Sequence, residues 1–188
     1  YNTDPAIQYL INNTELYFIP LVNPDGYLHD QTISPNGGGF WRKNRRLNVD
    51  GTRGVDLNRN YDYEFGYDNN GSSPNPSSEV YRGTHGFSEP ETQAVKLFCE
   101  QHQFQFALNY HTYSNLLIYP WGYIPSLLTP DSDLFIETAK HMTEFNHYQY
   151  GTANQTVGYV VNGSSDDWMY GQQSSKNIIF AMSPEAGT

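Results

Sequence analysis

His111 stands directly after the apolar segment FQFALNY, residues 104–110, and before Thr-Tyr-Ser. The apolar and aromatic residues of that segment predict a buried strand, which places the imidazole at the carboxyl end of the strand. Ligands of α/β proteins usually bind at this edge of the sheet, and imidazole is the commonest metal ligand among side chains. His111 is therefore a candidate metal-binding or ligand-binding residue.

Two arginines lie in segments without periodic patterning, Arg42 in WRKN and Arg59 in DLNRNYD. Asn58 and Asn60 flank Arg59, so amide groups surround its guanidinium. A guanidinium binds a carboxylate through two parallel hydrogen bonds, which makes this cluster a candidate carboxylate site. For each arginine a surface ion pair is the alternative.

Further polar groups occur near the end of the chain. Tyr159 precedes a Gly/Ser segment and two adjacent aspartates in YVVNGSSDDWMY. Ser165 and Asp166 stand just before Trp168, so a helix N-cap is the alternative interpretation. Glu185 ends the apolar segment NIIFAMSPE, where its carboxylate is either solvated or part of a site.

His141 and Glu144 form an HxxE pattern within a predicted helix at residues 131–145. Residues three apart share a helix face, and this spacing can bind zinc. The same helix carries an apolar stripe that includes Leu134 and Phe135. The pattern therefore favours a solvated polar face over a metal site.

Composition excludes several classes of partner. The chain has 188 residues, with 10 Lys and Arg against 20 Asp and Glu, and a net charge of −10. Nucleic acids and anionic membranes are both bound through clustered basic residues, so neither partner is expected. An aromatic content of 15% excludes disorder as the main state. The one cysteine, Cys99, lies in the apolar run AVKLFCE, which predicts a buried side chain and no internal disulfide.

The length suggests a single domain. Apolar segments predict strands at 15–27, 104–114, 116–120 and 177–185, the first ended by an Asn-Pro-Asp-Gly turn. Helices are predicted at 88–102, with Ser88 as N-cap and Glu91 completing a capping box, at 131–145 and at 164–173. Residues 28–54 and 67–79 are predicted loops. Strands that alternate with helices predict an α/β fold, with helices packed on the faces of a sheet.

Taken in order, the motifs of the chain resemble those of the zinc carboxypeptidases of the A/B type. These motifs are NPDGY, WRKN, DLNRNYD, SEPET, HTYSNLLIYPWGY, a tyrosine followed by GSSDDW, and a strand that ends in Glu. The resemblance covers nearly the whole chain in order and approximate spacing. It implies a mixed central sheet with helices on both faces, and a zinc site of the kind that carboxypeptidase A builds from two His and one Glu.

The resemblance implies roles for several of the candidate residues. His111 would be the third zinc ligand, and Asp56 would orient a ligand histidine. Arg42 would polarise the scissile carbonyl and stabilise the developing oxyanion. Glu185 would take a proton from zinc-bound water and pass it to the leaving amine.

The remaining roles concern the substrate. Asn58 and Arg59 would hold the C-terminal carboxylate of a peptide, and Tyr159 would close over it. Asp166 would face the bottom of the specificity pocket. An acid at this position resembles the B-type enzymes, which remove C-terminal Lys or Arg.

The chain departs from the family pattern in three respects. In the family an HxxE well upstream of the third ligand supplies the first two zinc ligands, but no HxxE precedes His111. The family also continues beyond the catalytic glutamate, and Ser183-Pro184 stands before Glu185 where many members have an aromatic residue or Thr. We therefore expect residues 1–188 to be the central and C-terminal part of a metallocarboxypeptidase catalytic domain, incomplete at the N-terminus and at the C-terminus. The full-length enzyme would hold one zinc ion, with its other two ligands outside this chain, and the 188 residues alone would be inactive.

The full-length protein is thus expected to remove C-terminal residues from peptides or proteins, with a preference for basic ones. One alternative is a non-catalytic module that binds peptide C-termini and has lost its zinc site. Another is a related amidase or deacylase on the same fold. Sequons at Asn12, Asn70, Asn154 and Asn162 are compatible with a secreted or periplasmic location. The oligomeric state is not indicated.

Overall fold

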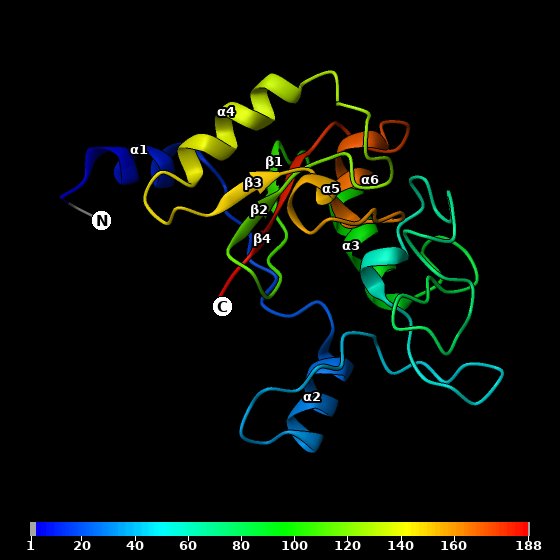
Figure 1. Cartoon of the computed structure of the whole chain (residues 1–188). Coiled ribbons are helices and arrows are strands. Elements are labelled where there is room, and N and C mark those ends of the chain that lie inside the picture. Colours follow the sequence, from blue (N-terminus) through cyan, green and yellow to red (C-terminus); the bar gives the residue numbers. More distant parts are fainter. Residues whose placement is uncertain (1–2, 188) are drawn as a thin grey trace.

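The computed structural model describes residues 3–187. The described residues up to Gln101 contain helices only, and strands and helices are interspersed from Phe106 onward (Figure 1). The order is α1 (Pro5–Asn13), α2 (Pro24–Ile33), the 3₁₀ helix η1 (Leu57–Arg59), α3 (Pro90–Gln101), β1 (Phe106–Leu108), β2 (Leu116–Ile118), α4 (Ser132–Met142), β3 (Gln149–Gly151), α5 (Ala153–Thr156), α6 (Ser165–Gly171) and β4 (Phe180–Glu185). Within residues 3–187, no helix combines the length and the apolar character needed to cross a bilayer.

The four strands form one mixed sheet in the order β1-β4-β2-β3. β4 pairs in parallel with β1 and antiparallel with β2, and β2 pairs in parallel with β3. The last strand of the chain therefore lies in the interior of the sheet. Its carboxyl end is held between two segments that come much earlier in the sequence.

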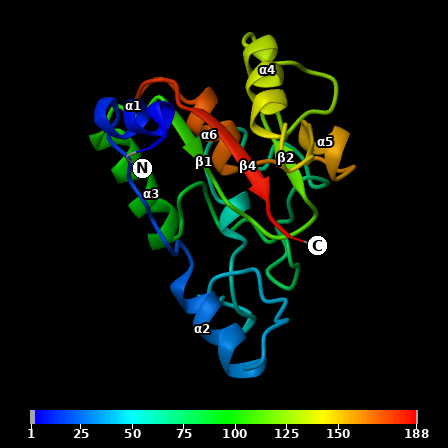
Figure 2. The same cartoon turned by 90° about the vertical axis from the view of Figure 1, so that its left-hand side faces the viewer.

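Helices cover both faces of the sheet, and Figure 2 shows α3 and α4 on opposite sides of β4. Successive residues of β4 point to opposite faces, as the two-residue period of a strand requires. Ala181 packs with Cys99 of α3 and Trp168 of α6 on one face. Met182 packs with Phe135 of α4 on the other face. The expected mixed α/β sheet with helices on both faces is therefore confirmed.

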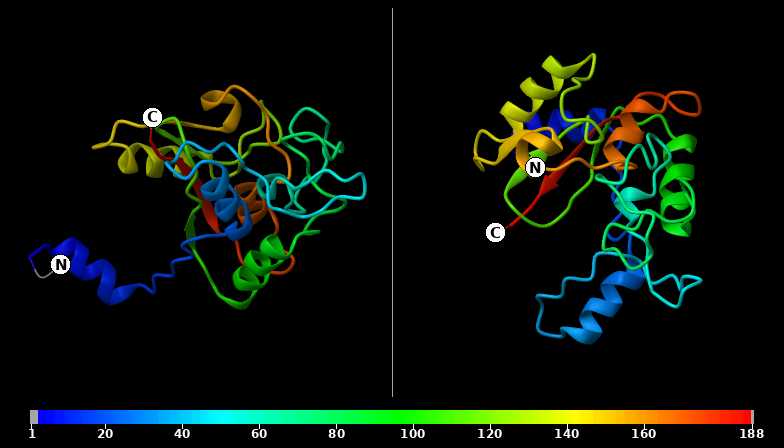
Figure 3. Two further views of the ribbon diagram at one scale, coloured as in Figure 1. Left: turned by 90° about the horizontal axis from the view of Figure 1, so that it is seen from below. Right: turned by 45° about the vertical axis from the view of Figure 1, so that its right-hand side comes forward.

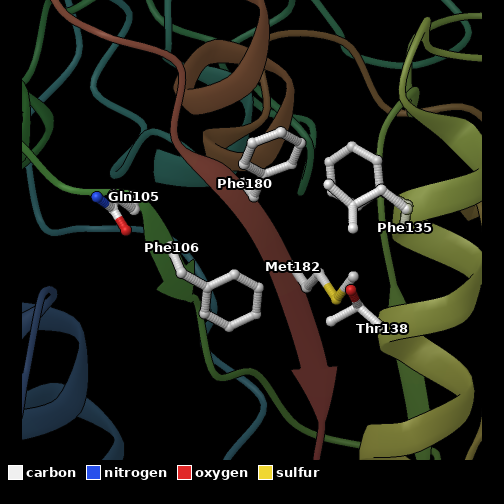
Figure 4. Close-up of a pocket in the computed structure, with 7 residues that line it drawn as sticks. Gln105, Phe106, Phe135, Thr138, Phe180 and Met182 are labelled. Carbon is white, nitrogen blue, oxygen red and sulfur yellow. The ribbon is translucent and has the colours of Figure 1, made fainter.

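An apolar groove of about 180 Å³ remains open between β1, β4 and α4. Figure 4 shows Phe106, Phe180 and Met182 of the strands near Phe135 and Thr138 of the helix. The groove lies on the face of the sheet that α4 covers, and Gln105 and Thr138 are its polar lining residues.

Six predicted elements occur in shorter form. The strands expected at 104–114, 116–120 and 177–185 contain β1, β2 and β4, and the helices expected at 88–102, 131–145 and 164–173 contain α3, α4 and α6. Residues 67–79 form turns and bends, as predicted. Cys99 is buried, and burial raises the pKa of its thiol to about 11.

The strand predicted at residues 15–27 is wrong. Residues 14–22 form no strand, and most of their apolar side chains are exposed, Phe18 to 83%. Asn23 does not open a turn but caps α2, because its Oδ1 accepts a hydrogen bond from the Gly26 amide at 3.0 Å. Pro24 then occupies the first helical position, where its fixed φ favours a helix. The loop predicted from residue 28 therefore begins only after Ile33.

The N-cap predicted for α3 is also wrong. Ser88 donates its hydroxyl hydrogen bond to Glu89 Oε1 at 2.6 Å and accepts no bond from the helix backbone. Glu89 is itself the N-cap residue and is fully buried, with its carboxylate also bound by Asn44 and Arg46. The local capping pattern is overridden by this long-range polar cluster.

Candidate active site

The side chain of Asp56 lies between two guanidinium groups. Arg42 Nε donates a hydrogen bond to Asp56 Oδ2 at 2.9 Å, and Arg42 Nη2 lies 2.8 Å from the same oxygen. Arg59 Nη1 lies 3.7 Å from that oxygen. Asp56 Oδ1 accepts the Asn58 amide at 3.1 Å and so caps η1, the short helix that carries Asn58 and Arg59. One buried carboxylate therefore positions both arginines that the sequence singled out.

Arg59 is buried, yet its hydrogen bonding is incomplete. Nη1 donates to the carbonyl of Asn58 at 2.8 Å, but Nε is a buried donor without a partner among the described residues. Burial lowers the pKa of the guanidinium, and Asp56 opposes this effect. A buried polar group is normally hydrogen-bonded, so the orphaned Nε indicates a missing acceptor. A carboxylate would supply one.

His111, three residues beyond the end of β1, forms a parallel bridge with Glu185, the last residue of β4. The His111 amide donates to the carbonyl of Pro184 at 2.9 Å, and the Ala186 amide donates to the carbonyl of His111 at 2.9 Å. Burial lowers the pKa of His111, while the charge of Asp56 raises it and Arg42 and Arg59 lower it. Burial raises the pKa of Glu185, an effect that Arg42 opposes. His111 and Glu185 therefore share one electrostatic environment with the two arginines.

Asp166, at the start of α6, is almost fully buried and hydrogen-bonded through both oxygens. Asn109 Nδ2 donates to Oδ1 at 2.7 Å, and Ser183 Oγ donates to Oδ2 at 2.7 Å. Burial raises the pKa of Asp166 to about 6 in spite of these bonds. No basic side chain among residues 3–187 forms an ion pair with it.

Asp167, the next residue, connects α6 to the segment that follows β2. Its carboxylate accepts the amides of Gly122, at 2.9 Å and 3.1 Å, and of Tyr123, at 3.1 Å. Burial, together with the neighbouring charge of Asp166, raises the pKa of Asp167 to about 7, although the hydrogen bonds from the Gly122 and Tyr123 amides oppose the shift. The cap of this helix is Ser164, whose hydroxyl accepts the Asp167 amide, rather than Ser165 or Asp166.

The η1 segment is also tied to α6, since Asn58 Oδ1 accepts the amide of Ser165 at 2.9 Å. Tyr159 is 52% exposed and lies close enough to Arg59 to affect its pKa. The structure thus gathers the predicted site residues at one edge of the sheet. They are Arg42, Asp56, Asn58, Arg59, His111, Tyr159, Asp166 and Glu185.

Asn109 and Ser183 were not identified from the sequence. Each stands two residues before a predicted site residue, Asn109 before His111 and Ser183 before Glu185. Because side chains alternate along extended backbone, residues two apart point to the same side. This spacing is the signal that could have identified them.

Residues 3–187 contain no group of three or more His, Cys, Asp or Glu side chains arranged to hold a metal ion. His111 offers one imidazole, next to Glu185 and the two arginines. Asp56 has hydrogen bonds from Arg42 and the Asn58 amide, so its predicted role in orienting a ligand histidine stays a prediction. His141, in the HxxE pattern, is exposed, as expected for a solvated helix face. Its Nε2 lies 3.9 Å from Glu137 Oε1 on the same helix.

The chain is similar to known carboxypeptidases in both sequence and structure. It is 36% identical to mouse carboxypeptidase A4 over 179 residues, which cover 90% of this chain and 40% of that protein. It is 33% identical to bovine carboxypeptidase A1 over 190 residues, which cover 97% of this chain and 43% of that protein. The crystal structure of thrombin activatable fibrinolysis inhibitor superposes with a TM-score of 0.82 at 28% identity, over 98% of this chain and 46% of that one.

The chain therefore spans less than half the length of these relatives. The sequence profile described as "Zinc carboxypeptidase" matches residues 1–187, almost the full length of the chain. The order of motifs, the mixed sheet and the gathered polar residues agree with this match. The chain belongs to the zinc carboxypeptidase family.

Proposed function

We propose that the protein of which this chain is part is a zinc-dependent exopeptidase that hydrolyses the C-terminal bond of peptides. The observation that carries the proposal is the buried guanidinium of Arg59, whose Nε has no acceptor among the described residues while Asp56 fixes its position. A guanidinium in this state suits the free carboxylate that distinguishes a peptide C-terminus from an internal peptide bond. The family membership of the chain supports the same activity.

In this proposal Arg59 and Asn58 bind the terminal carboxylate, and Tyr159, which is exposed, closes over the bound residue. Arg42 polarises the carbonyl of the scissile bond, because its guanidinium is already oriented by Asp56 and needs no rearrangement. Asp56 thus acts as a positioning residue for both arginines.

His111 is the residue of this chain that would hold zinc, and its half-buried imidazole, with a lowered pKa, favours the neutral form that binds metals. Bound zinc supplies a Lewis acid and lowers the pKa of a bound water. Glu185 accepts a proton from the attacking water and returns it to the leaving amine. Burial raises the pKa of Glu185 above that of a solvated glutamate, which makes its carboxylate a better proton acceptor.

Asp166 supports a preference for C-terminal Lys or Arg. Its carboxylate is buried and held by two neutral donors, Asn109 and Ser183, rather than by a cation. A basic side chain of the substrate would supply the counter-charge that residues 3–187 do not provide. In the full-length protein, hippuryl-Arg should be cleaved faster than hippuryl-Phe, and Asp166→Ile should reverse the order. Equal rates for the two substrates in the wild type would exclude the preference.

The exopeptidase proposal is tested by measuring how fast the full-length protein hydrolyses a peptide with a free C-terminal carboxylate and the same peptide with a C-terminal amide. Wild type should hydrolyse only the free acid, and Arg59→Met should lose most of this selectivity. The matched control is Arg53→Met, since Arg53 is exposed and forms no ion pair among the described residues. Equal hydrolysis of acid and amide by wild type would indicate the related amidase. Tight binding of the free acid without hydrolysis or zinc would indicate the non-catalytic binding module.

A further inference from the structure

An open groove of about 310 Å³ lies between α2 and the segment around Arg45. Asp25, Leu28, His29 and Thr32 line it from α2, and Arg45 lines it from the opposite side. Leu28 and His29 each lie three or four positions from Asp25 and from Thr32, so the four residues share one helix face. In Figures 1 and 2, α2 lies below the carboxyl end of β4, on the side of the site.

Arg45 is held in place without an acidic partner. Its guanidinium carbon lies 4.4 Å from the centre of the Trp41 ring, a cation–π contact. Among residues 3–187 no carboxylate lies within ion-pair distance of it. Stacking on an aromatic ring leaves the N–H groups at the edge of the guanidinium available to an acceptor.

Trp41, the platform for Arg45, is itself fixed. Its backbone amide donates to Asp30 Oδ1 at 3.0 Å, and its indole Nε1 donates to the carbonyl of Asn44 at 3.1 Å. The ring of His29 packs edge-on against it, with the centroids 5.0 Å apart. A cation on a fixed platform loses little conformational freedom when it binds, which favours affinity.

The groove is connected to the reaction centre through one short segment. Trp41 is adjacent to Arg42, and Asn23, the N-cap of α2, donates to the carbonyls of Arg42 and Lys43 at 3.4 Å and 3.1 Å. Arg45 follows Arg42 by three positions, so their Cα atoms are at most about 11 Å apart. An extended peptide spans that distance with about three residues.

The local charge favours an anion although the chain as a whole is acidic. Six of the ten Lys and Arg residues lie between positions 42 and 59, namely Arg42, Lys43, Arg45, Arg46, Arg53 and Arg59. Lys43 is engaged by the carbonyls of Pro76 and Ser78, and Arg46 by Glu89, whereas Arg45 remains free of such partners. A local excess of positive charge attracts anionic groups before contact.

We propose that Arg45 and this groove bind an acidic side chain of the peptide substrate, about three to five residues before its C-terminus. The inference rests on the proposed exopeptidase function and adds a second point of recognition to it. Asp25 lies in the same groove and opposes an acidic ligand, so it limits the strength of the site. Substitutions of Arg45 and of Asp25 should therefore change the affinity for an acidic peptide in opposite directions.

The test uses fluorescent peptides that carry a D-residue before the C-terminus to resist hydrolysis, with Glu or Gln at the third, fourth or fifth position from the end. Their dissociation constants are measured with the full-length protein. At one position Glu should bind about three- to fivefold more tightly than Gln, as expected for a partly exposed charge pair. Arg45→Gln should abolish this ratio, and Asp25→Asn should increase it.

Lys140→Gln is the control, because it makes the same change of net charge at an exposed position on α4. It should leave the Glu/Gln ratio unchanged. The inference is overturned if Arg45→Gln retains the wild-type ratio, or if Lys140→Gln reduces the ratio equally. Because binding is read without hydrolysis, failure of the exopeptidase proposal would appear separately, as an absence of cleavage of ordinary peptides.

Discussion

Replacing the buried carboxylate of Asp166 by an amide should make the protein more stable at alkaline pH than at acidic pH, relative to wild type. In Asp166→Asn the shape of the side chain is retained. Asn109 can still donate to the remaining oxygen, and the Ser183 hydroxyl can rotate to accept from the new amide. The substitution therefore removes the ionisation and keeps the hydrogen bonds.

The expected size follows from the pKa of Asp166, which burial raises from 3.8 to about 6. A group with a higher pKa in the folded state stabilises the fold below its unfolded pKa, and this contribution is lost as the pH rises through the folded pKa. A difference of about two pKa units is equivalent to about 3 kcal/mol. Between pH 4 and pH 8 the free energy of unfolding of Asp166→Asn should therefore rise by about 2 to 3 kcal/mol relative to wild type.

The assay is urea unfolding of both proteins at several pH values. Asp50→Asn is the control of opposite sign, because the hydroxyl of Thr52 lowers the pKa of the exposed Asp50. That contribution is present above the unfolded pKa and is lost at acidic pH, so the control should lose stability relative to wild type as the pH rises. A difference between Asp166→Asn and wild type that does not change with pH would refute the reasoning.

Three further predictions concern the same site. His111→Ala in the full-length protein should abolish zinc retention and hydrolysis together, and a variant that keeps a full equivalent of zinc by metal analysis would contradict this. Asp56→Asn should lower the free energy of unfolding by about 3 to 5 kcal/mol, because Arg59 would stay buried without its counter-charge, and a loss below about 1 kcal/mol by urea unfolding would argue against that reason. Lowering the pH from 8 to 5 should reduce the kcat/KM ratio of hippuryl-Arg to hippuryl-Phe, because Asp166 becomes protonated near pH 6, and a constant ratio would show that its charge does not select the substrate.

The elements that the sequence predicted best are those whose signals are local. A helix was predicted at 164–173 and contains α6, although its cap is Ser164 and not Ser165 or Asp166. α1 was missed although Asp4 and Pro5 give the ordinary signals of a helix start, a capping side chain and a proline at the first helical position. Asp4 accepts the Ala6 amide at 2.9 Å. α1 buries no residue, and Figure 3 shows it projecting from the rest of the molecule.

The segment before Asn23 shows why apolar content alone is a weak signal for a strand. A strand requires hydrogen-bonding partners, and the backbone of residues 14–22 pairs with no strand among the described residues. Tyr17 does pack against Phe98, His102 and Phe104, so part of the segment contacts the α3 side of the molecule. The predicted strand is not formed, and most of the apolar side chains of the segment are exposed, so the predicted burial is wrong as well.

Long-range contacts account for what the sequence could not provide at the site. Residue types and motif order were enough to identify Arg42, Arg59 and Glu185 as candidates. The bond between Asn58 and the Ser165 amide joins residues 107 positions apart, and no local pattern predicts it. The same holds for Asp166 and its partner Asn109, 57 positions away. These contacts determine which side chains of each motif point into the site.

The backbone pairing of His111 with Glu185 has a consequence for how the site tolerates mutation. Neighbouring extended segments lie about 4.8 Å apart whatever side chains they carry. The amide and carbonyl of His111 hold it to the β4 segment through two hydrogen bonds of 2.9 Å. Substitutions in the core beneath the sheet would therefore displace the imidazole and the carboxylate together rather than change their spacing. Sequence divergence within the two core clusters can thus alter the stability of the protein while the distance between its proposed zinc ligand and its proposed base is preserved.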